Sequence, residues 1–369
     1  MAYMSKNSDS GYSHSFPAIR GVQAGRVFYV AMCPMKIVPK IFIFNEEEVP
    51  PELRAQRVLN RARIPEIASY LVDNPNNYIL SALTASVDAT NVSFQPYTDT
   101  GPFSNMGTLK VPMDVNILIN DGQHRRAAIE EALKEYPALG QDNIPVLFFM
   151  DAGLIRSQQM FADLNKYAVR PSYSLGTLYD HRDASSELAR FLANTCVAFS
   201  GLTEMEKSTI SNRSTKLFTL SGIKHASRAL LRKSNIDKIT DKEKVVAKEF
   251  WDTVAEYLPD WKLARERKVS TADLRQNFIH AHGVALHALG LLGANLLADH
   301  PKDWEKYLQK LSKVDWSRSN TNLWEGRAMV HGRISKATTN VILTSNLIKK
   351  YLGLALKPDE AELEKEVTK

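Results

Sequence analysis

Residues 117–126, ILINDGQHRR, decide the fold, because three apolar residues run directly into a dense polar cluster. The apolar half is typical of a strand, and residues 125–136 have the spacing of a helix. Between them, Asp121 and Gly122 are typical of a turn, and the glycine lets the backbone come close to a ligand. The stretch therefore predicts a strand, a turn and a helix in direct succession.

Two arginines occupy the first turn of this predicted helix. Cations there oppose the helix dipole at a cost of a few tenths to about 1 kcal/mol each, whereas the unpaired amides of a helix start attract an anion. We therefore expect a phosphate-bearing ligand to bind the turn and helix start, namely Gly122, Gln123, His124, Arg125 and Arg126. The alternative is that Asp121 caps the helix and that both arginines pair with acidic neighbours.

The neighbouring segments extend this α/β pattern. Helical spacing over 53–71 is divided at Pro65, where a proline ends or kinks a helix. Residues 98–107 are rich in turn formers and are expected to be a loop. Strands are expected over four further segments: 26–32, 36–44, 78–94 (as a pair) and 144–150.

Helical spacing dominates the rest of the chain, over 154–169, over 174–199 and beyond 217. The strand signal disappears near 170–205, where we place a domain boundary. The predicted fold class is α+β. The expected parts are a disordered lead-in (1–20), an α/β domain (21–200), an all-helical domain (201–357) and a charged tail (358–369).

Composition excludes several classes of protein. At 369 residues the chain is too long for one small core, and its net charge of +6 permits nucleic-acid binding without demanding it. No apolar run approaches the roughly 20 residues that span a bilayer. Cys33 and Cys196 lie too far apart in sequence for a CxxC metal or redox pair. We expect both to be buried thiols in a reducing cytoplasm, with Cys33 the better candidate for redox sensing.

The basic residues are unevenly distributed. Residues 207–236 hold seven cations and no Asp or Glu. Lys224, Arg228 and Arg232 are spaced i, i+4, i+8, which predicts one cationic helix face. Double-stranded DNA is the natural partner of such a face. The alternative is an ordinary solvated helix face.

A second polar group follows the predicted helix over 154–169. Lys166 and Arg170 lie four positions apart, as two residues on one helix face do, and Asn165 precedes them. We expect these three to add phosphate contacts. The alternative is that Asn165 ends a helix and that the following DHRD segment, residues 180–183, forms internal salt bridges.

A third basic segment is WEGRAMVHGRISKATTN, residues 324–340. It is rich in glycine, serine and threonine, and it is either a DNA-contacting loop or the join between domains. Its candidate DNA ligands are Arg327, Arg333 and Lys336.

The histidines of HAHGVALH, residues 280–287, favour packing over metal binding. His280 and His287 are seven positions apart, whereas helical metal pairs are four apart. Gly283, Gly290 and Gly293 indicate close helix packing in the same segment. We therefore expect core histidines and neither a metal site nor a metal cluster.

The DGQHRR segment resembles the DGQHR-domain proteins, relatives of the ParB/sulfiredoxin superfamily, which hold nucleotide phosphates at such a helix start. Further segments resemble the DndB family of DNA sulfur modification proteins from about Phe16 to Leu354, among them FADLNKYAVRPSYSLGTLYDHRD and FIHAHGVALHALG. The resemblance implies that residues 21–200 form a ParB-like DGQHR domain, with a nucleoside triphosphate as its cofactor.

One departure limits the chemistry that the resemblance implies. Sulfiredoxins place a nucleophilic cysteine, and ParB proteins an acidic residue, where this chain has Gln123. An amide is neither a nucleophile nor a general base. Catalysis would then fall to Asp121 or His124, so nucleotide binding without efficient turnover is as plausible as hydrolysis.

The resemblance implies a cytoplasmic DNA-binding protein that regulates transcription of the modification genes. Its expected partners are double-stranded DNA and other DNA sulfur modification proteins, with no membrane, and a homo-oligomer stays open. The rival readings are a nucleotide hydrolase or DNA-nicking enzyme at the DGQHR site, and a scaffold that does not touch DNA. Gln123 counts against the enzyme, and the cations of 207–236 count against the scaffold.

Overall fold

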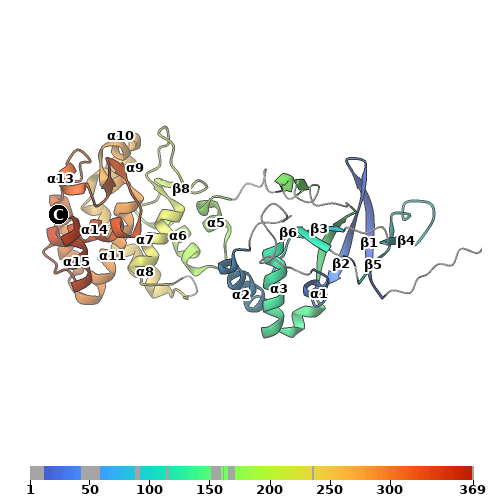
Figure 1. Cartoon of the computed structure of the whole chain (residues 1–369). Coiled ribbons are helices and arrows are strands. Elements are labelled where there is room, and N and C mark those ends of the chain that lie inside the picture. The colour runs from blue at the N-terminus through green and yellow to red at the C-terminus, as the bar shows by residue number, and fades with distance from the viewer. Residues whose placement is uncertain are drawn as a thin grey trace, which may run out of the picture. The chain divides into compact units, whose positions relative to one another are not determined.

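The computed structural model describes residues 12–42, 59–87, 92–113, 115, 117–150, 159–160, 162–164, 171–234 and 237–367. The chain divides into two compact units, Met1–Val169 and Arg170–Lys369 (Figure 1). The first contains a sheet and a few helices, and the second is almost entirely helical. The predicted α+β class is therefore confirmed.

The first unit is built on a seven-stranded sheet with the order β4-β5-β1-β2-β7-β3-β6. All neighbouring strands are antiparallel except β3 and β7, which are parallel. The strands are β1 (Ser13–Gln23), β2 (Arg26–Pro34), β3 (Leu83–Val87), β4 (Ser93–Pro96), β5 (Met106–Pro112), β6 (Ile117–Asp121) and β7 (Asn143–Phe149).

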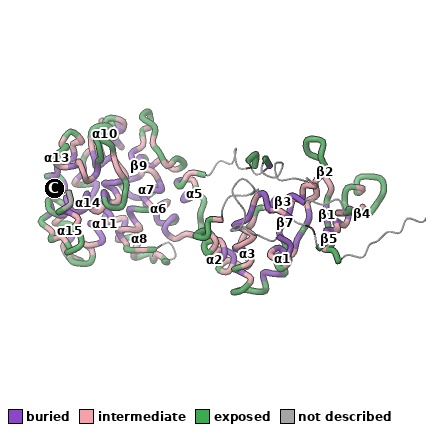
Figure 2. The backbone as a smooth tube through the Cα atoms, in the orientation of Figure 1, coloured by how far each residue is buried: buried purple, intermediate pink, exposed green. Residues whose placement is uncertain are grey.

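Three α-helices lie side by side in this unit, α1 (Val38–Ile41), α2 (Ile64–Asp73) and α3 (Gln123–Glu135) (Figure 1). Short 3-10 turns, Arg61–Arg63 and Pro137–Gln141, precede α2 and follow α3. The apolar side chains of α3, such as Ile129, share one buried core with β3 and β7. All five residues of β3 are buried (Figure 2). The turn between β6 and α3 therefore lies beside the buried core of this unit.

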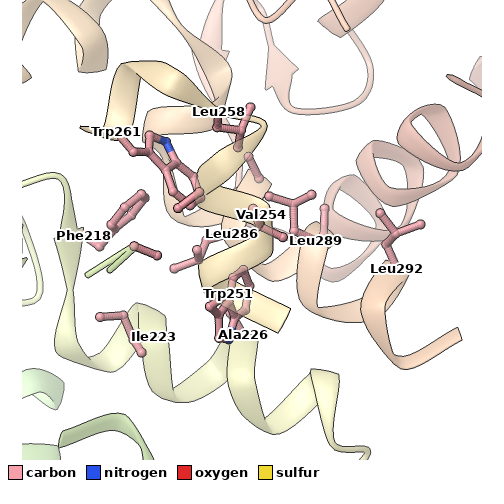
Figure 3. Packing of buried hydrophobic residues seen from close by; sticks show 14 of the residues in the cluster. Phe218, Ile223, Ala226, Trp251, Val254, Leu258, Trp261, Leu286, Leu289 and Leu292 are labelled. Atoms are coloured by element: carbon pink, nitrogen blue, oxygen red, sulfur yellow. The ribbon is translucent and has the colours of Figure 1, made fainter. Parts of the chain in front are cut away.

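The second unit packs its helices around α7 (Leu220–Leu230) and α11 (Gly283–Asp299). Its core contains the fully buried Trp251 and Trp261 (Figure 3), and Trp324 is fully buried as well. The other helices are α5 (Tyr173–Tyr179), α6 (Ala184–Thr195), α8 (Asp241–Glu256), α9 (Pro259–Arg265), α10 (Thr271–Asn277), α12 (Trp304–Leu308), α13 (Thr321–Trp324), α14 (Thr338–Leu352) and α15 (Pro358–Val367), with 3-10 turns at Ile279–Ala281 and Gln309–Lys313.

Two small strand pairs complete this unit. The strands β8 (Thr203–Glu204) and β9 (Phe218–Thr219) run parallel, and β10 (Met329–Val330) and β11 (Arg333–Ile334) form a hairpin. Gly290 and Gly293 of α11 pack closely, as the sequence predicts, whereas a Cβ on Gly283 would approach only the end of the Lys336 side chain. A Cβ on Gly290 would lie 2.2 Å from the carbonyl oxygen of Ala226 in α7, so the two helix backbones touch there.

The predicted start and end of the chain need correction. The expected lead-in over 1–20 is not disordered from Ser13 onward, because β1 lies between β2 and β5 and buries Phe16 and Ala18. The expected charged tail over 358–369 is largely the helix α15. Its Glu360 pairs with Lys349 of α14. The sequence of the last dozen residues alone does not indicate this partner.

The domain boundary also lies earlier than the 200/201 division expected. The helices α5 and α6 belong to the second unit, which begins at residue 170. The expected single helix over 174–199 is two helices, because Asp180 accepts hydrogen bonds from the backbone of residues 182 and 183, and Asp183 then caps α6. Both side chains favour a turn over a continued helix.

Three predictions about local elements were wrong in part. Residues 38–41 form α1 rather than part of a strand over 36–44, and residues 43–44 lie outside the described residues. The strands β3 and β4 within 78–94 do not pair with each other. Pro65 lies in the first turn of α2, which suits a residue that lacks an amide hydrogen, rather than between two α-helices.

Most of the strands predicted around the opening stretch are confirmed. The strands β2, β6 and β7 cover the predicted segments 26–32, 115–120 and 144–150 to within two residues. The helix expected over 154–169 falls mostly outside the described residues, and residues 159–160 and 162–164 are helical.

Candidate functional site

The strand, turn and helix of ILINDGQHRR form as predicted. The strand β6 ends at Asp121, α3 begins at Gln123, and Gly122 lies between them with φ of 101°, a conformation that favours glycine. A Cβ at this position would lie 2.4 Å from Cδ2 of Leu83. No side chain caps α3, so Asp121 does not have the capping role of the alternative interpretation.

Both arginines of the motif pair with acidic neighbours, as the alternative interpretation expects. Arg125 forms an ion pair with Asp121 at 2.7 Å. Arg126 forms an ion pair with Glu130 and donates to two carbonyl oxygens, those of Phe42 at 3.0 Å and Pro39 at 2.8 Å. The guanidinium groups therefore have structural roles that do not require a ligand.

The two residues between the glycine and the arginines are buried. The Nε2 atom of His124 accepts a hydrogen bond from the backbone amide of Asn60 at 3.1 Å, so that nitrogen is unprotonated. The Oε1 atom of Gln123 is buried and has no hydrogen-bond partner among the described residues. Among the described residues the site thus contains two buried polar atoms whose hydrogen-bonding capacity is unused, Oε1 of Gln123 and Nε of Arg125.

The local candidates for catalysis are both engaged. Asp121 is held by Arg125, and the Nε2 lone pair of His124 is occupied by Asn60. The predicted further phosphate ligands Asn165, Lys166 and Arg170 lie outside the described residues.

The three cations spaced i, i+4, i+8 do not form one helix face. The helix α7 ends at Leu230, and Arg232 lies beyond it with φ of 53°. Arg232 donates to the carbonyl oxygen of Ala294 at 2.9 Å. Arg228 is half-buried within α7. The predicted continuous strip is therefore wrong as a structure, although the residues themselves stay candidate DNA ligands.

Acidic residues from elsewhere in the second unit neutralise part of this region. Lys224 pairs with Asp183, which caps α6, and Lys233 pairs with Glu243 of α8 at 2.8 Å. These carboxylates are distant in sequence and close in the fold. An acid-free window of sequence therefore did not predict an acid-free surface.

The basic segment 324–340 forms the hairpin β10–β11 and the turn that leads into α14. Arg327 is nearly buried and pairs with Glu364 of α15 at 2.9 Å. Arg333 and Lys336 are exposed, and neither takes part in an ion pair with any described residue. Among the six predicted DNA ligands, these two have the environment that a phosphate contact requires.

Two cationic residues that the sequence reasoning missed lie near Lys336. Arg275 of α10 and Arg318 line a cavity of about 590 Å³ together with Lys336. They are separated by 43 and 18 positions in the chain, with Asp and Glu residues between them, so no local charge pattern marks them. The fold brings them together, since Arg318 donates to the carbonyl oxygens of Gln276, which follows Arg275, and of Gly332.

The histidines of residues 280–287 have packing roles where the structure shows their contacts. His280 is buried, accepts a hydrogen bond from the indole of Trp261 and bonds to Asp260 at 3.0 Å, which confirms a core histidine. The Nε2 atom of His282 bonds to the carbonyl oxygen of Arg275 at 2.7 Å. No group of three or more His, Cys, Asp or Glu residues in the described part of the chain is arranged to hold a metal.

Cys33 and Cys196 are both buried free thiols, as predicted. Burial raises the pKa of the Cys33 thiol to about 12, so it is not a thiolate at neutral pH. Cys196 donates to Asp252, and burial is again the main cause that raises its pKa. In the described residues no helix has both the length and the apolar character to cross a bilayer.

Comparison with known proteins gives one match. The family model for DndB, described as DNA-sulfur modification-associated, matches residues 16–355, which is nearly the whole chain. No curated protein and no solved structure matches significantly.

Proposed function

We propose a function from one premise: this chain belongs to the DndB family of DNA-sulfur modification-associated proteins. Membership implies involvement in DNA sulfur modification. Within that process, our proposal is that the chain binds double-stranded DNA and regulates transcription of the modification genes. Other DNA sulfur modification proteins are its proposed partners.

The observation that carries the DNA-binding proposal is the state of Arg333 and Lys336. Both are exposed, and neither is neutralised by an acid in the described part of the chain, whereas Lys224 and Arg327 are engaged by carboxylates. DNA phosphates attract cations whose charge is still available, and each contact releases counterions from the duplex.

The backbone around Arg333 is held firmly. His331 and Gly332 adopt positive φ at the tip of the β10–β11 hairpin, and the Glu325 carboxylate accepts hydrogen bonds from both of their amides. Arg318 donates to the carbonyl oxygen of Gly332 at 3.2 Å. A firmly held backbone loses less conformational entropy when the side chain that it carries contacts a phosphate, which favours this hairpin as the DNA-contacting element.

The test is DNA affinity as a function of salt concentration, measured by fluorescence anisotropy on promoter DNA and on random DNA. The Arg333→Ala, Lys336→Ala double variant is expected to flatten the plot of log affinity against log salt by about 1.8 units, at roughly 0.9 per phosphate contact. Lys302→Ala is the matched control. It removes an exposed cation beyond the other end of α11, about 25 Å away at 1.5 Å per residue.

An unchanged salt slope in the double variant, with the fold intact, would overturn this choice of surface. The triple variant Lys224→Ala, Arg228→Ala, Arg232→Ala gives the competing expectation, a slope flatter by about 2.7 units on the same scale. If neither variant differs from the control, DNA binding by the second unit is wrong. An NTPase assay with and without the same DNA separates a regulator from a nucleotide hydrolase.

A second candidate function, nucleotide binding at the DGQHRR segment, is favoured by the unpartnered oxygen of Gln123. We propose that a nucleoside triphosphate would bind there, with phosphates at Gly122, His124, Arg125 and Arg126. The ligand would compete with Asp121 and Glu130 for the arginines. Thermal-shift measurements with ATP, CTP and GTP on Gln123→Met and on the unaltered protein test this, and equal shifts in both proteins would contradict it.

A further inference from the structure

The second unit contains a cavity that neither the family description nor the proposed functions use. Its volume is about 590 Å³, within the range of a few hundred to about a thousand Å³ typical of small-ligand sites. The loop around Asn212, the first turns of α7 and α11, and α10 form its walls. All of these elements belong to the same compact unit.

The charged side chains that line this cavity are all positive. Arg275, Arg318 and Lys336 line it, and no Asp or Glu does among the described residues. The rest of the lining is divided between hydroxyl or amide side chains, such as Thr209 and Asn212, and apolar ones such as Leu286. A cavity of this composition suits a ligand with an anionic group at one end and a less polar body at the other.

The charges of the two arginines are fixed in position without being neutralised. Arg275 donates to the carbonyl oxygens of Ser211 at 3.0 Å and Ser214 at 3.2 Å, and also to that of Lys216. Arg318 donates to the carbonyl oxygen of Gln276 at 3.1 Å. Carbonyl oxygens satisfy the N–H groups but carry no net charge, so the positive potential in the cavity persists.

Lys336 has a different place in this arrangement. Its side chain is exposed and passes over Gly283, where a Cβ would meet Cε and Nζ at 3.3 Å. It pairs with no described acid. Lys336 is therefore able to move to contact a ligand, whereas the two arginines hold positive charges at fixed positions in the cavity.

The pKa of His282 is affected by the same positive charges. Its ring lies at the start of α11 and bonds to the carbonyl oxygen of Arg275. Burial, opposed in part by that hydrogen bond, and then the charges of Arg318, Lys336 and Arg275 lower the pKa of His282 to about 4. Burial and all three cations that line the cavity act on one imidazole, which therefore stays neutral at physiological pH and adds no charge of its own.

We propose that this cavity binds a small phosphate ester of nucleotide size, with the phosphate between Arg318 and Lys336. The partly buried arginines and the partly closed shape favour a free ligand over a phosphate of duplex DNA, which contacts proteins along an open surface. The inference does not depend on DNA binding by the hairpin. The only residue the two sites share is Lys336.

The experiment is isothermal titration calorimetry of the full-length protein with AMP, with inorganic phosphate and with a DNA duplex. AMP is expected to bind, and phosphate more weakly. Lys336→Met should weaken AMP binding by about tenfold or more, as the loss of a charge-assisted contact does. Lys302→Met, at the far end of α11, is the matched control and should leave AMP affinity unchanged.

A second variant separates this cavity from the DNA surface. Gly283→Val would place a branched side chain in the lining without altering any charge. It is expected to abolish AMP binding, whereas duplex affinity should fall no further than in Lys336→Met, because the new side chain meets only the end of Lys336 and phosphate contacts on an open surface do not need the volume of the cavity. NMR of the His282 ring adds a direct readout, since a bound anion should raise its pKa.

Each contrary outcome is distinguishable. Absence of AMP and phosphate binding at millimolar concentration would overturn the proposal, as would AMP binding that neither Gly283→Val nor Lys336→Met alters. If only the duplex binds, and Gly283→Val weakens it more than Lys336→Met does, the cavity holds a DNA phosphate and the free ligand is wrong. If AMP binds as expected and the duplex does not, the proposal for the cavity is supported and the proposed DNA-binding function is wrong.

Discussion

Arg126 donates through Nε to the carbonyl oxygen of Phe42, which lies 84 positions earlier in the chain, at 3.0 Å. Together with the bond to Pro39, this contact ties the first turn of α3 to α1. The second arginine of the DGQHRR segment therefore connects two elements of the sheet unit. A loss of function on its replacement has two physical explanations, loss of a ligand contact and loss of stability.

Arg126→Ala is expected to destabilise the first unit by about 2–3 kcal/mol, because it removes two carbonyl contacts and leaves Glu130 without its partner. Arg125→Ala should cost less, on the order of 1 kcal/mol, because its partner Asp121 has a side chain that is 48% exposed. Urea denaturation of both variants measures the difference. Full stability of Arg126→Ala with loss of nucleotide binding would instead restore a purely ligand-binding role.

Gly122→Ala is expected to lower the free energy of unfolding by about 2–3 kcal/mol. The φ of 101° is strained for any other residue, and the new Cβ would overlap Cδ2 of Leu83. Gly101→Ala is the matched control, because Gly101 has φ of 87° and a Cβ placed there would have no neighbouring atom within 4 Å. In the control, backbone strain should lower the free energy of unfolding by only about 1 kcal/mol. Equal losses in the two variants would show that contact with Leu83 is unimportant.

Local sequence patterns predicted the turn at Gly122 because all of its determinants are local. An apolar strand, a glycine that accepts positive φ and a helix that begins at the next residue occupy ten consecutive positions. Local sequence patterns could not predict the partners of Arg126. Phe42 follows a short helix in a segment whose sequence is typical of a strand, and no pattern around residue 126 indicates that α1 lies beside α3.

The charge predictions failed for a related reason. Lys224 has no acidic residue within 12 positions on either side, yet it pairs with Asp183. A lysine that is only partly exposed gains from any carboxylate that the fold brings near, whatever its distance in sequence. The cationic cavity is the opposite case. Arg275 and Arg318 looked ordinary in sequence and became a charge cluster only through packing.

Gly290→Ala is expected to destabilise the second unit by about 2–3 kcal/mol or more, because its Cβ would lie 2.2 Å from the backbone oxygen of Ala226 and would force α7 and α11 apart. Gly283→Ala on the same helix is the control. Its Cβ would approach only the flexible end of Lys336, so stability should change by less than about 0.5 kcal/mol. Thermal unfolding followed by circular dichroism compares the two, and a tolerated Gly290→Ala would contradict the contact.

His282 is expected to make stability fall with acidification. Burial and the nearby Arg318, Lys336 and Arg275 hold its folded-state pKa at about 4, below the ordinary value of 6.5. The unfolded chain therefore binds a proton at a higher pH than the folded protein does. The stabilising contribution is fully present above pH 6.5 and is lost progressively toward pH 4, by on the order of 2–3 kcal/mol at most.

The measurement of this effect is the free energy of unfolding at pH 7, 5.5 and 4.5 for the unaltered protein and for His282→Gln. Glutamine keeps a donor for the carbonyl oxygen of Arg275 and does not titrate. Because the carboxylates titrate equally in both proteins, the difference between them isolates the imidazole. The advantage of the unaltered protein should shrink by about 2 kcal/mol between pH 7 and 4.5. A constant difference would mean that neither burial nor the cations lining the cavity lower the pKa of His282, and it would remove the support that this ring gives to a positive cavity.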